Sequence, residues 1–339
     1  MNSPTTKIAV FGAGSIGCYL GGLLKSQDAD LVFIGRSRLQ HAVKQNGLTL
    51  THFQNAPIHL GAEKVTIKTS SSALSDCDLI LLCTKSQDTA LAAQDILKHA
   101  KPGAHVISCQ NGIRNVAVLK EELGTAFKVS GAIVPFNVTP NGSASYHCGT
   151  GGTLHFEHNL PDDVCLAFNK AGQATQYGGN FEGDQWAKLL VNLNNALNTL
   201  SGGTLRESFS QKDYRRAFAC VIQEGLDVAK TKDIEVGRFN GHSPKAVIKL
   251  LKLPNVLYRI LMDHIVKIDA KARSSMLDDL EIGRKSEIEY LQGEIVRQGK
   301  ILGVETYANS NVLDAINTAF EKGMSPKLSG TEILKLVKK

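Results

Sequence analysis

The sequence predicts a two-domain protein, with an α/β domain built on a mostly parallel sheet followed by a domain made of helices. Three observations predict this. The chain has 339 residues, a length that suits two domains, each burying its own core. Short apolar runs alternate with helical segments in the first half, and from Asp184 onward the pattern is almost wholly helical. We therefore expect an α/β domain over residues 1–180 and an all-α domain over residues 181–339.

The strands of the first domain are expected where short, β-rich apolar runs occur. These runs cover residues 7–11, 31–34, 79–83, 105–108 and 128–134. Helical patterns lie between several of them, at residues 18–24, 89–99 and 116–123. Because parallel strands need crossover connections, this alternation predicts helices on both faces of the sheet. Residues 142–179 are rich in glycine and short β-like pieces.

Composition excludes several classes of protein. Hydrophobic residues make up 42% and charged residues 21%, and no apolar run approaches the roughly 18 residues of a membrane-spanning helix. The polar start lacks the pattern of a secretory signal, so we expect a soluble, cytoplasmic protein. Seven scattered cysteines without a Cys-x-x-Cys pair predict reduced thiols. A net charge of +6 without a basic tract argues against nucleic acid and fits anionic small molecules.

A glycine motif follows the first predicted strand and opens a helix. It comprises Gly12, Ala13, Gly14, Ser15, Ile16 and Gly17. In this context Gly12 can make the tight turn, Gly14 can let a pyrophosphate approach the backbone, and Gly17 can pack the helix on the strand. The helix N-terminus would offer unpaired N–H groups to the phosphates. The motif predicts a Rossmann-type dinucleotide site, and the alternative is a tight turn without a ligand.

The end of the second predicted strand bears on the choice of cofactor. Domains that bind NAD usually carry an acidic residue there for the ribose hydroxyl groups. This chain has Arg36 and Arg38 instead, and guanidinium groups bind a 2′-phosphate through charge-assisted hydrogen bonds. NADP is therefore favoured over NAD, with Arg36 as its 2′-phosphate ligand. The alternative is that both arginines are solvated loop charges.

One predicted helix of the second domain carries a polar stripe. At 100° per residue, Asn192 lies about 40° round from Lys188, and Asn195 lies about 20° away on the other side. Apolar residues cover much of the remaining surface, so the stripe needs a partner. Lysine and asparagine suit an anionic substrate that accepts hydrogen bonds. Taken alone, the helix also allows a lysine that extends to solvent beside surface asparagines.

Two further segments complete the set of candidate residues. Ser274 and Ser275 open an acidic helical stretch, and Ser286 and Glu289 have the spacing of a capping box, which would place Glu287 in the first turn of a new helix. His155 and His158 lie in β-like sequence, where a spacing of three puts them on opposite faces. No metal site is expected from them.

Together these segments closely resemble the ketopantoate reductases (2-dehydropantoate 2-reductases). The resemblance is collinear over nearly the whole chain. The matching motifs are the glycine loop, Gly35-Arg36, Cys83-Thr84-Lys85, Gln110-Asn111-Gly112, the helix Trp186-x-Lys188-x-x-x-Asn192, Ser274-Ser275-Met276-Leu277-x-Asp279, and Ser286-Glu287-Ile288. Several such motifs in order are more specific than any one of them.

The resemblance implies a role for each matching residue. Lys188 would be the catalytic proton donor, and Asn192 and Ser275 would hold the substrate. Lys85, Asn111 and Glu287 would organise the cofactor and the space around its nicotinamide, where Asn111 would also meet the substrate.

The resemblance also implies a fold and a reaction. The fold would be a Rossmann domain joined to an all-helical domain like that of 6-phosphogluconate dehydrogenase, with the active site in the cleft between them. The reaction would be NADPH-dependent reduction of 2-dehydropantoate to pantoate in pantothenate biosynthesis. Hydride would attack the C2 carbonyl, and the lysine would stabilise and protonate the resulting alkoxide. A homodimer is left open.

One departure from the family pattern affects the substrate. Many members place a second substrate-contacting asparagine eight residues after the lysine, where this chain has Ala196. Asn195, one place earlier, could substitute for it in holding the substrate, although its direction would differ. The segment 210–270 also looks longer than in compact members. Two alternatives therefore stay open. One is an NADP-dependent reductase of another 2-keto or 3-hydroxy acid, and the other is an NADPH sensor without turnover.

Overall fold

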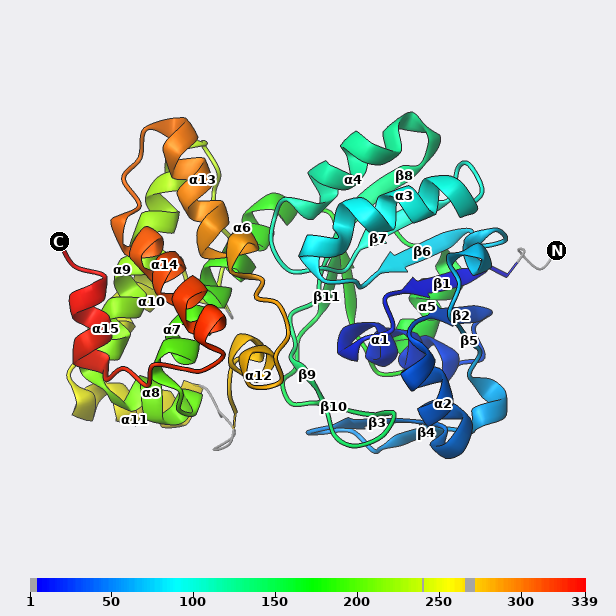
Figure 1. The fold of residues 1–339 in the computed structure, drawn as a ribbon, viewed down its shortest axis with the longest axis horizontal. Helices are drawn as coiled ribbons and strands as arrows, with labels where there is room; N and C mark the ends of the chain where they lie inside the picture. The colour runs from blue at the N-terminus through cyan, green and yellow to red at the C-terminus, as the bar shows by residue number, and fades with distance from the viewer. Residues whose placement is uncertain (1–4, 240, 266–271) are drawn as a thin grey trace. The chain divides into compact units, whose positions relative to one another are not determined.

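The protein folds into two compact units. The computed structural model describes residues 5–239, 241–265 and 272–339 (Figure 1). One unit comprises Met1–Phe181 and the other Glu182–Lys339. Each is described by itself below.

An eight-stranded sheet forms the centre of the N-terminal unit. Its strand order is β12-β11-β8-β7-β6-β1-β2-β5. The strands are β1 (Ile8–Phe11), β2 (Leu31–Ile34), β5 (Ile67–Lys68), β6 (Leu79–Leu82), β7 (His105–Ser108), β8 (Lys128–Ile133), β11 (Leu154–Phe156) and β12 (Thr175–Tyr177). Neighbouring strands are parallel except β8 and β11, so the sheet is mostly parallel, as the alternating sequence pattern predicts.

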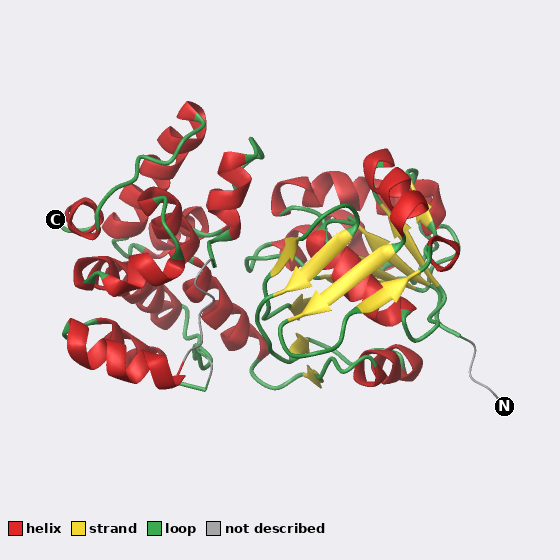
Figure 2. Cartoon of the chain, turned by 90° about the horizontal axis from the view of Figure 1, so that it is seen from below, coloured by secondary structure: helices red, strands yellow, loops and turns green. Residues whose placement is uncertain are grey.

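Helices cover both faces of this sheet (Figure 2). They are α1 (Ser15–Lys25), α2 (Ser37–Asn46), α3 (Thr89–His99), α4 (Asn115–Leu123) and α5 (Asp162–Lys170). One apolar core joins the sheet to α1 and α5, and a separate core joins its other face to α3 and α4. Successive strand side chains alternate between these cores, as Val10 and Phe11 do. The predicted arrangement, a mostly parallel sheet with helices on both faces, is therefore confirmed.

Two features of this unit were not expected from the sequence. The strands β4 (Ile58–Leu60), β3 (Leu48–His52), β10 (Ser145–Cys148) and β9 (Val138–Pro140) form a second, four-stranded sheet in that order. The segment 142–179, which the sequence presents as glycine-rich and β-like, also contains α5. Asp162 and Asp163 in the first turn of α5 complement its dipole.

The C-terminal unit is helical, as predicted. Its helices are α6 (Phe181–Asn192, whose first residue ends the other unit), α7 (Asn194–Ser201), α8 (Leu205–Ser210), α9 (Lys212–Thr231), α10 (Pro244–Leu251), α11 (Asn255–Ile265), α12 (Ser275–Glu281), α13 (Gln292–Leu302), α14 (Tyr307–Lys322) and α15 (Gly330–Leu336). The 20-residue helix α9 is the longest among the described residues, and α10, α13, α14 and α15 pack against it. In the described part of the chain, no helix is long and apolar enough to cross a membrane.

A buried arginine ties α9 to its neighbours. Arg215 has no exposed surface, and its guanidinium donates hydrogen bonds to four backbone carbonyls and to Asn255 Oδ1. The ring of Tyr258 on α11 lies 4.0 Å below it. Because a charged group is costly to bury without hydrogen bonds, this set of acceptors is what makes the position tolerable.

Candidate functional site

The glycine motif forms a tight turn between β1 and α1. Gly12 has φ +100°, and a Cβ there would lie 2.6 Å from Thr84 N. A Cβ on Gly17 would lie 2.4 Å from Gly12 O and 2.9 Å from Val10 Cγ1. Both positions therefore require glycine, one for its backbone conformation and both for close packing.

The middle glycine differs from its two neighbours. Gly14 is exposed and caps α1, and no atom lies within 4 Å of a Cβ placed on it. Packing does not require glycine here, but the open space in front of the backbone suits an approaching phosphate. The first turn of α1 contains no acidic residue, so its N–H groups and dipole favour an anion. Ala13, Ser15 and Ile16 complete the turn and are half-buried.

The arginine predicted to select NADP lies where the sequence places it. Arg36 follows β2 by two residues, caps α2 and is exposed. Arg38, in the first turn of α2, is exposed as well. Both are accessible to an anionic ligand.

Lys85 and Asn111 follow neighbouring parallel strands, β6 and β7. Gln110 connects their loops, because its Nε2 donates to Thr84 Oγ1 at 3.2 Å and to the carbonyls of Thr84 and Lys85 at 3.1 and 3.4 Å. The buried Asn115 on α4 donates from Nδ2 to Asn111 O at 2.6 Å. The sequence motif marks Gln110, but nothing in the sequence singles out Asn115.

A second layer of hydrogen bonds completes this connection. Ser86, directly after Lys85, donates from its hydroxyl to Asn111 O at 3.1 Å and accepts from Asn115 Nδ2 at the same distance. Thr89 Oγ1 lies 2.9 Å from Asn115 Oδ1 and 2.9 Å from Gln110 Nε2. The loops that carry Lys85 and Asn111 are therefore fixed relative to each other.

In the C-terminal unit, Lys188 lies on α6, one turn before the buried Asn192. Lys188 is half-buried, and burial lowers the pKa of its ammonium group to about 8. A lysine with this pKa is mostly protonated at neutral pH yet gives up its proton far more readily than an ordinary lysine. That combination suits a proton donor.

Lys188, Asn192 and Asn195 all lie on helices, but the predicted single helix is divided into two at one residue. The helix is interrupted at Leu193, where α6 ends and α7 begins. Leu193 O accepts a hydrogen bond from the buried Gln292 Nε2 at 2.8 Å. Leu193 nevertheless keeps helical dihedral angles, φ −57° and ψ −25°, and its N–H donates to Leu189 O at 3.1 Å, so α7 follows α6 directly.

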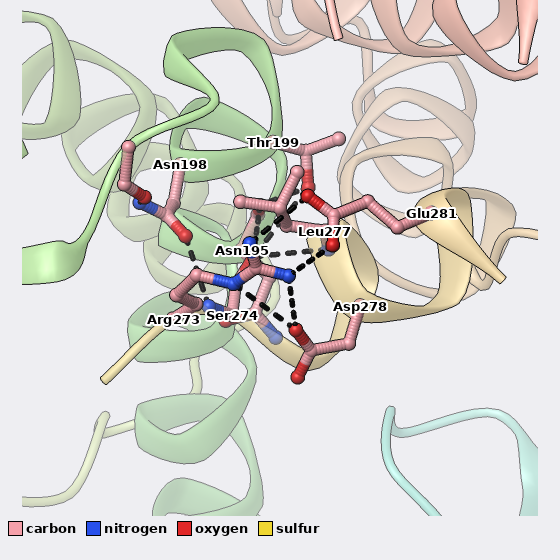
Figure 3. Close-up of polar contacts among 9 residues, drawn as sticks. Asn195, Asn198, Thr199, Arg273, Ser274, Leu277, Asp278 and Glu281 are labelled. Carbon is pink, nitrogen blue, oxygen red and sulfur yellow. Dashed lines mark hydrogen bonds and ion pairs between the residues drawn. The ribbon is translucent and has the colours of Figure 1, made fainter. Parts of the chain in front are cut away.

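The two serines before α12 have different environments. Ser274 is buried and caps the helix, with its hydroxyl accepting from Leu277 N at 3.2 Å and donating to Asn195 O at 3.1 Å (Figure 3). Ser275 is the first helical residue and is exposed. Ser274 thus fixes the helix start, and the Ser275 hydroxyl faces solvent where a ligand can reach it.

Two residues that the sequence analysis did not single out, Asn198 and Arg273, stabilise the start of α12. Asn198 on α7 accepts from Ser274 N and donates to Gly203 O and Ser208 Oγ at 3.0 and 3.2 Å. Arg273 pairs with Asp278 and Glu281 on α12, at 2.7 and 2.5 Å (Figure 3). Asn198 lies one helical turn after Asn195, so the polar pattern of α7 was the only available signal.

The predicted capping box at Ser286 and Glu289 is wrong. Ser286 Oγ accepts from Ile288 N at 3.0 Å, two residues on. Glu287 is half-buried and caps a short 3₁₀ turn, Ile288–Tyr290, rather than lying in the first turn of an α-helix. The serine hydroxyl closes a local turn here in competition with helix capping.

His155 and His158 differ in how far their side chains are buried. His155 is buried on β11, with Nε2 lying 2.7 Å from Gly178 O, whereas the His158 side chain is mostly exposed. Among the described residues, no group of three or more potential ligands could hold a metal ion.

The glycine turn at the centre of a parallel sheet defines the N-terminal unit as a Rossmann-type domain, here followed by a helical domain. Residues 8–160 match the sequence profile of ketopantoate reductase PanE/ApbA, and residues 180–319 match the profile of its C-terminal domain. The chain belongs to this family, and it is an oxidoreductase.

Individual relatives agree with this assignment. The chain is 29% identical to a 2-dehydropantoate 2-reductase of Pyrococcus horikoshii, over 89% of this chain and 94% of the relative. It is 25% identical to that of Halobacterium salinarum, over 94% and 100%. A crystal structure of a PanE/ApbA family ketopantoate reductase from Ralstonia eutropha superposes with a TM-score of 0.79, 26% identity and coverage of 94% and 99%. A D-mandelate dehydrogenase bound to NADH and anilino(oxo)acetate, 20% identical over 94% and 99%, shares the fold with a TM-score of 0.77.

Proposed function

We propose that the protein reduces 2-dehydropantoate to pantoate with NADPH, and that Lys188 is the proton donor. The observation that carries this proposal is a half-buried lysine with a pKa of about 8, one helical turn from a buried asparagine, in a chain of the ketopantoate reductase family. A pKa close to neutral pH is where general acid catalysis is most efficient.

The glycine turn fits a dinucleotide. The open backbone at Gly14 and the N-terminus of α1 can receive the pyrophosphate, and Arg36 can bind a 2′-phosphate. Lys85 and Asn111, which the Gln110 and Asn115 hydrogen bonds fix together, would hold the nicotinamide end. The bound cofactor would supply the hydride. Glu287 would assist from the helical domain.

The remaining chemistry belongs to side chains of the helical domain. As the C2 carbonyl is reduced, negative charge develops on its oxygen. The Lys188 ammonium would stabilise that charge and then transfer a proton to the alkoxide. Asn192 and the exposed Ser275 hydroxyl would donate hydrogen bonds to the substrate, with Asn195 as a further candidate.

A second candidate function is reduction of a different 2-keto acid. Ala196 is buried where many family members have a substrate-contacting asparagine, so one polar contact expected for ketopantoate is missing at this position. The D-mandelate dehydrogenase that shares the fold was crystallised with NADH, and mandelate is a 2-hydroxy acid. The cofactor and the substrate therefore both need a direct comparison.

The test is oxidation of NADPH and of NADH by the purified protein with a panel of keto acids. The panel contains ketopantoate, pyruvate, 2-ketoisovalerate, oxaloacetate and benzoylformate, the keto acid that corresponds to mandelate. We expect the highest kcat/KM for ketopantoate with NADPH. A higher value for another keto acid would transfer the assignment to that substrate, and stoichiometric NADPH binding without turnover would favour the sensor.

The variant Lys188→Ala tests the mechanism. Loss of the general acid should lower turnover on the order of 10²–10⁴-fold, while NADPH binding persists. Lys230→Ala, which removes an exposed lysine of α9, serves as the control and should keep normal turnover. Near-normal turnover in folded Lys188→Ala would contradict the role, and Lys85 would become the next candidate.

The homodimer stays a prediction. One solved relative, the ketopantoate reductase of Staphylococcus aureus, is described as dimeric. Light scattering on the purified protein would give the mass directly.

A further inference from the structure

A basic pocket lies within the helical domain. It has a volume of about 500 Å³ and is lined by Lys212, Arg216, Cys220, Lys252 and Lys338. Lys212, Arg216 and Cys220 follow each other at intervals of four on α9, so they share one face of that helix. Lys252 directly follows α10, and Lys338 lies two residues after α15. Figure 1 shows α9, α10 and α15 together in this domain.

The charges of this pocket are mostly uncompensated. Arg216 lies 3.2 Å from Asp213, a carboxylate that also accepts from Thr331 Oγ1 at 3.1 Å. In the described part of the chain, no ion pair within 4 Å joins Lys212, Lys252 or Lys338 to a carboxylate. Four cations around one pocket with a single paired carboxylate create a positive potential that attracts anions.

The positively charged side chains of this pocket lie near the thiol of Cys220. Burial raises the pKa of Cys220, and the charges of Lys252, Lys338 and Arg216 act in the opposite direction, while the Glu224 carboxylate adds to the rise. Their joint effect indicates that three segments distant in sequence present their charges to one place. With its pKa raised, the thiol is neutral and adds no competing negative charge.

The pocket walls are held in place by hydrogen bonds that are buried or partly buried. Arg215, the neighbour of Arg216, donates to Leu251 O at 3.3 Å and to Leu253 O at 2.9 Å, on either side of Lys252. At the other wall, Gln211 Oε1 accepts from Gly330 N at 2.8 Å at the start of α15. These bonds fix the backbone from which Lys212, Lys252 and Lys338 extend, whereas the three exposed lysine side chains become ordered only when a ligand binds.

We propose that this pocket binds a small multivalent anion, of the pyrophosphate or tricarboxylate type. Its volume falls within the range of small-molecule sites and exceeds what a single chloride would fill. None of its lining residues is aromatic, so nothing there would stack on a nucleobase. Lysines act as point charges toward such anions, and Arg216 can form paired hydrogen bonds. The proposal does not depend on the keto acid reduced or on the cofactor.

Calorimetric titrations with inorganic pyrophosphate and with citrate, at constant ionic strength, test the proposal. We expect saturable binding of at least one of them by the wild type and by Lys249→Ala, which removes an exposed lysine of α10 outside the pocket. Arg216→Ala and Lys252→Ala should each weaken binding on the order of tenfold, the usual effect of a lost charge-assisted contact. The relative affinities decide between a phosphate and a carboxylate ligand.

Two outcomes would overturn the proposal. One is absence of saturable binding of either anion, or equal affinity in all four proteins. The other is binding that Gly14→Val abolishes and Lys252→Ala leaves unchanged, which would place the anion at the glycine turn. Thermal melting without ligand controls for folding. Because like charges in the empty pocket repel one another, Lys252→Ala should melt at or above the wild-type temperature at low salt.

Discussion

The side-chain oxygen of Asn198 accepts a hydrogen bond from the backbone N–H of Ser274 at 2.9 Å, and the two residues are 76 positions apart. Ser274 in turn donates from its hydroxyl to Asn195 O, one helical turn before Asn198. These two bonds fix the start of α12, and with it Ser275, against α7 (Figure 3). The proposed substrate contacts therefore depend on a residue that need not touch the substrate itself.

Asn198→Ala should destabilise the fold. Asn198 has no exposed surface, and alanine would leave the buried N–H of Ser274 without this acceptor. We expect the free energy of unfolding to fall by about 1–3 kcal/mol in urea denaturation. Asn195→Ala is the control, because the contacts of Asn195 in this group come from its backbone carbonyl. An equal loss in the control would argue against the Asn198 side chain as the source.

The glycine motif makes a paired prediction that separates folding from binding. Gly17→Ala should lower the free energy of unfolding by about 1–3 kcal/mol, because its Cβ would meet Gly12 O and Val10 at close range. Gly14→Ala should change stability by no more than about 0.5 kcal/mol, since nothing lies near its Cβ. Its NADPH affinity should nevertheless fall, as the methyl group enters the proposed phosphate space. Thermal melting and NADPH titration check both variants. Equal destabilisation by the two substitutions would contradict the assignment of Gly17 to packing and Gly14 to cofactor binding.

Arg36→Ala should alter the choice of cofactor. If its guanidinium binds the 2′-phosphate, its removal costs charge-assisted bonds worth about 1.5–3 kcal/mol. Affinity for NADPH should therefore fall roughly tenfold to hundredfold, with NADH little changed. Fluorescence titration with both cofactors measures this. Equal losses for the two cofactors would refute the assignment and direct attention to Arg38.

The sequence predicted the fold well where local pattern and packing agree. The strands β1 and β6 are short apolar runs buried on both faces of a parallel sheet, and such runs are recognisable without tertiary information. The helix α5 was missed because Asp162–Lys170 lies among glycines and short strands that favoured a β interpretation. The second sheet depends on β3 pairing with β10, nearly a hundred residues later, which local pattern cannot show.

Sequence motifs identified several candidate residues of the site, but not the residues that hold them in place through long-range contacts. Gln110 and Asn111 stand in a recognisable motif, whereas Asn115 reads as an ordinary first residue of a helix. Its role comes only from the approach of its amide to Asn111 O. The hydrogen bond that Leu193 O accepts was likewise hidden, because its donor is Gln292, 99 residues away in the sequence. Contacts between residues so far apart cannot be predicted from local helical periodicity.

The lowered pKa of Lys188 predicts a specific pH dependence of activity. Above pH 8 the ammonium loses its proton, so kcat/KM for keto acid reduction should fall, approaching tenfold per pH unit. Oxidation of the hydroxy acid needs the neutral amine and should rise over the same range. Lys188→Arg keeps a permanent charge, so any residual reduction should lose this alkaline decline. A decline at the same pH in the arginine variant would assign it to another group.

The same shift predicts how stability depends on pH. The pKa of Lys188 is about 8 in the folded protein and near 10.5 when unfolded, so the unfolded chain binds more protons between these values. Burial of the charged form therefore costs stability fully below pH 8, and the cost disappears as pH rises toward 10.5. Lys188→Met does not carry this cost. Denaturation of both proteins from pH 7 to 10 should show wild-type stability rising relative to the methionine variant only above about pH 8. A constant difference across that range would mean that Lys188 titrates alike in both states, and would remove the basis for its role as a tuned proton donor.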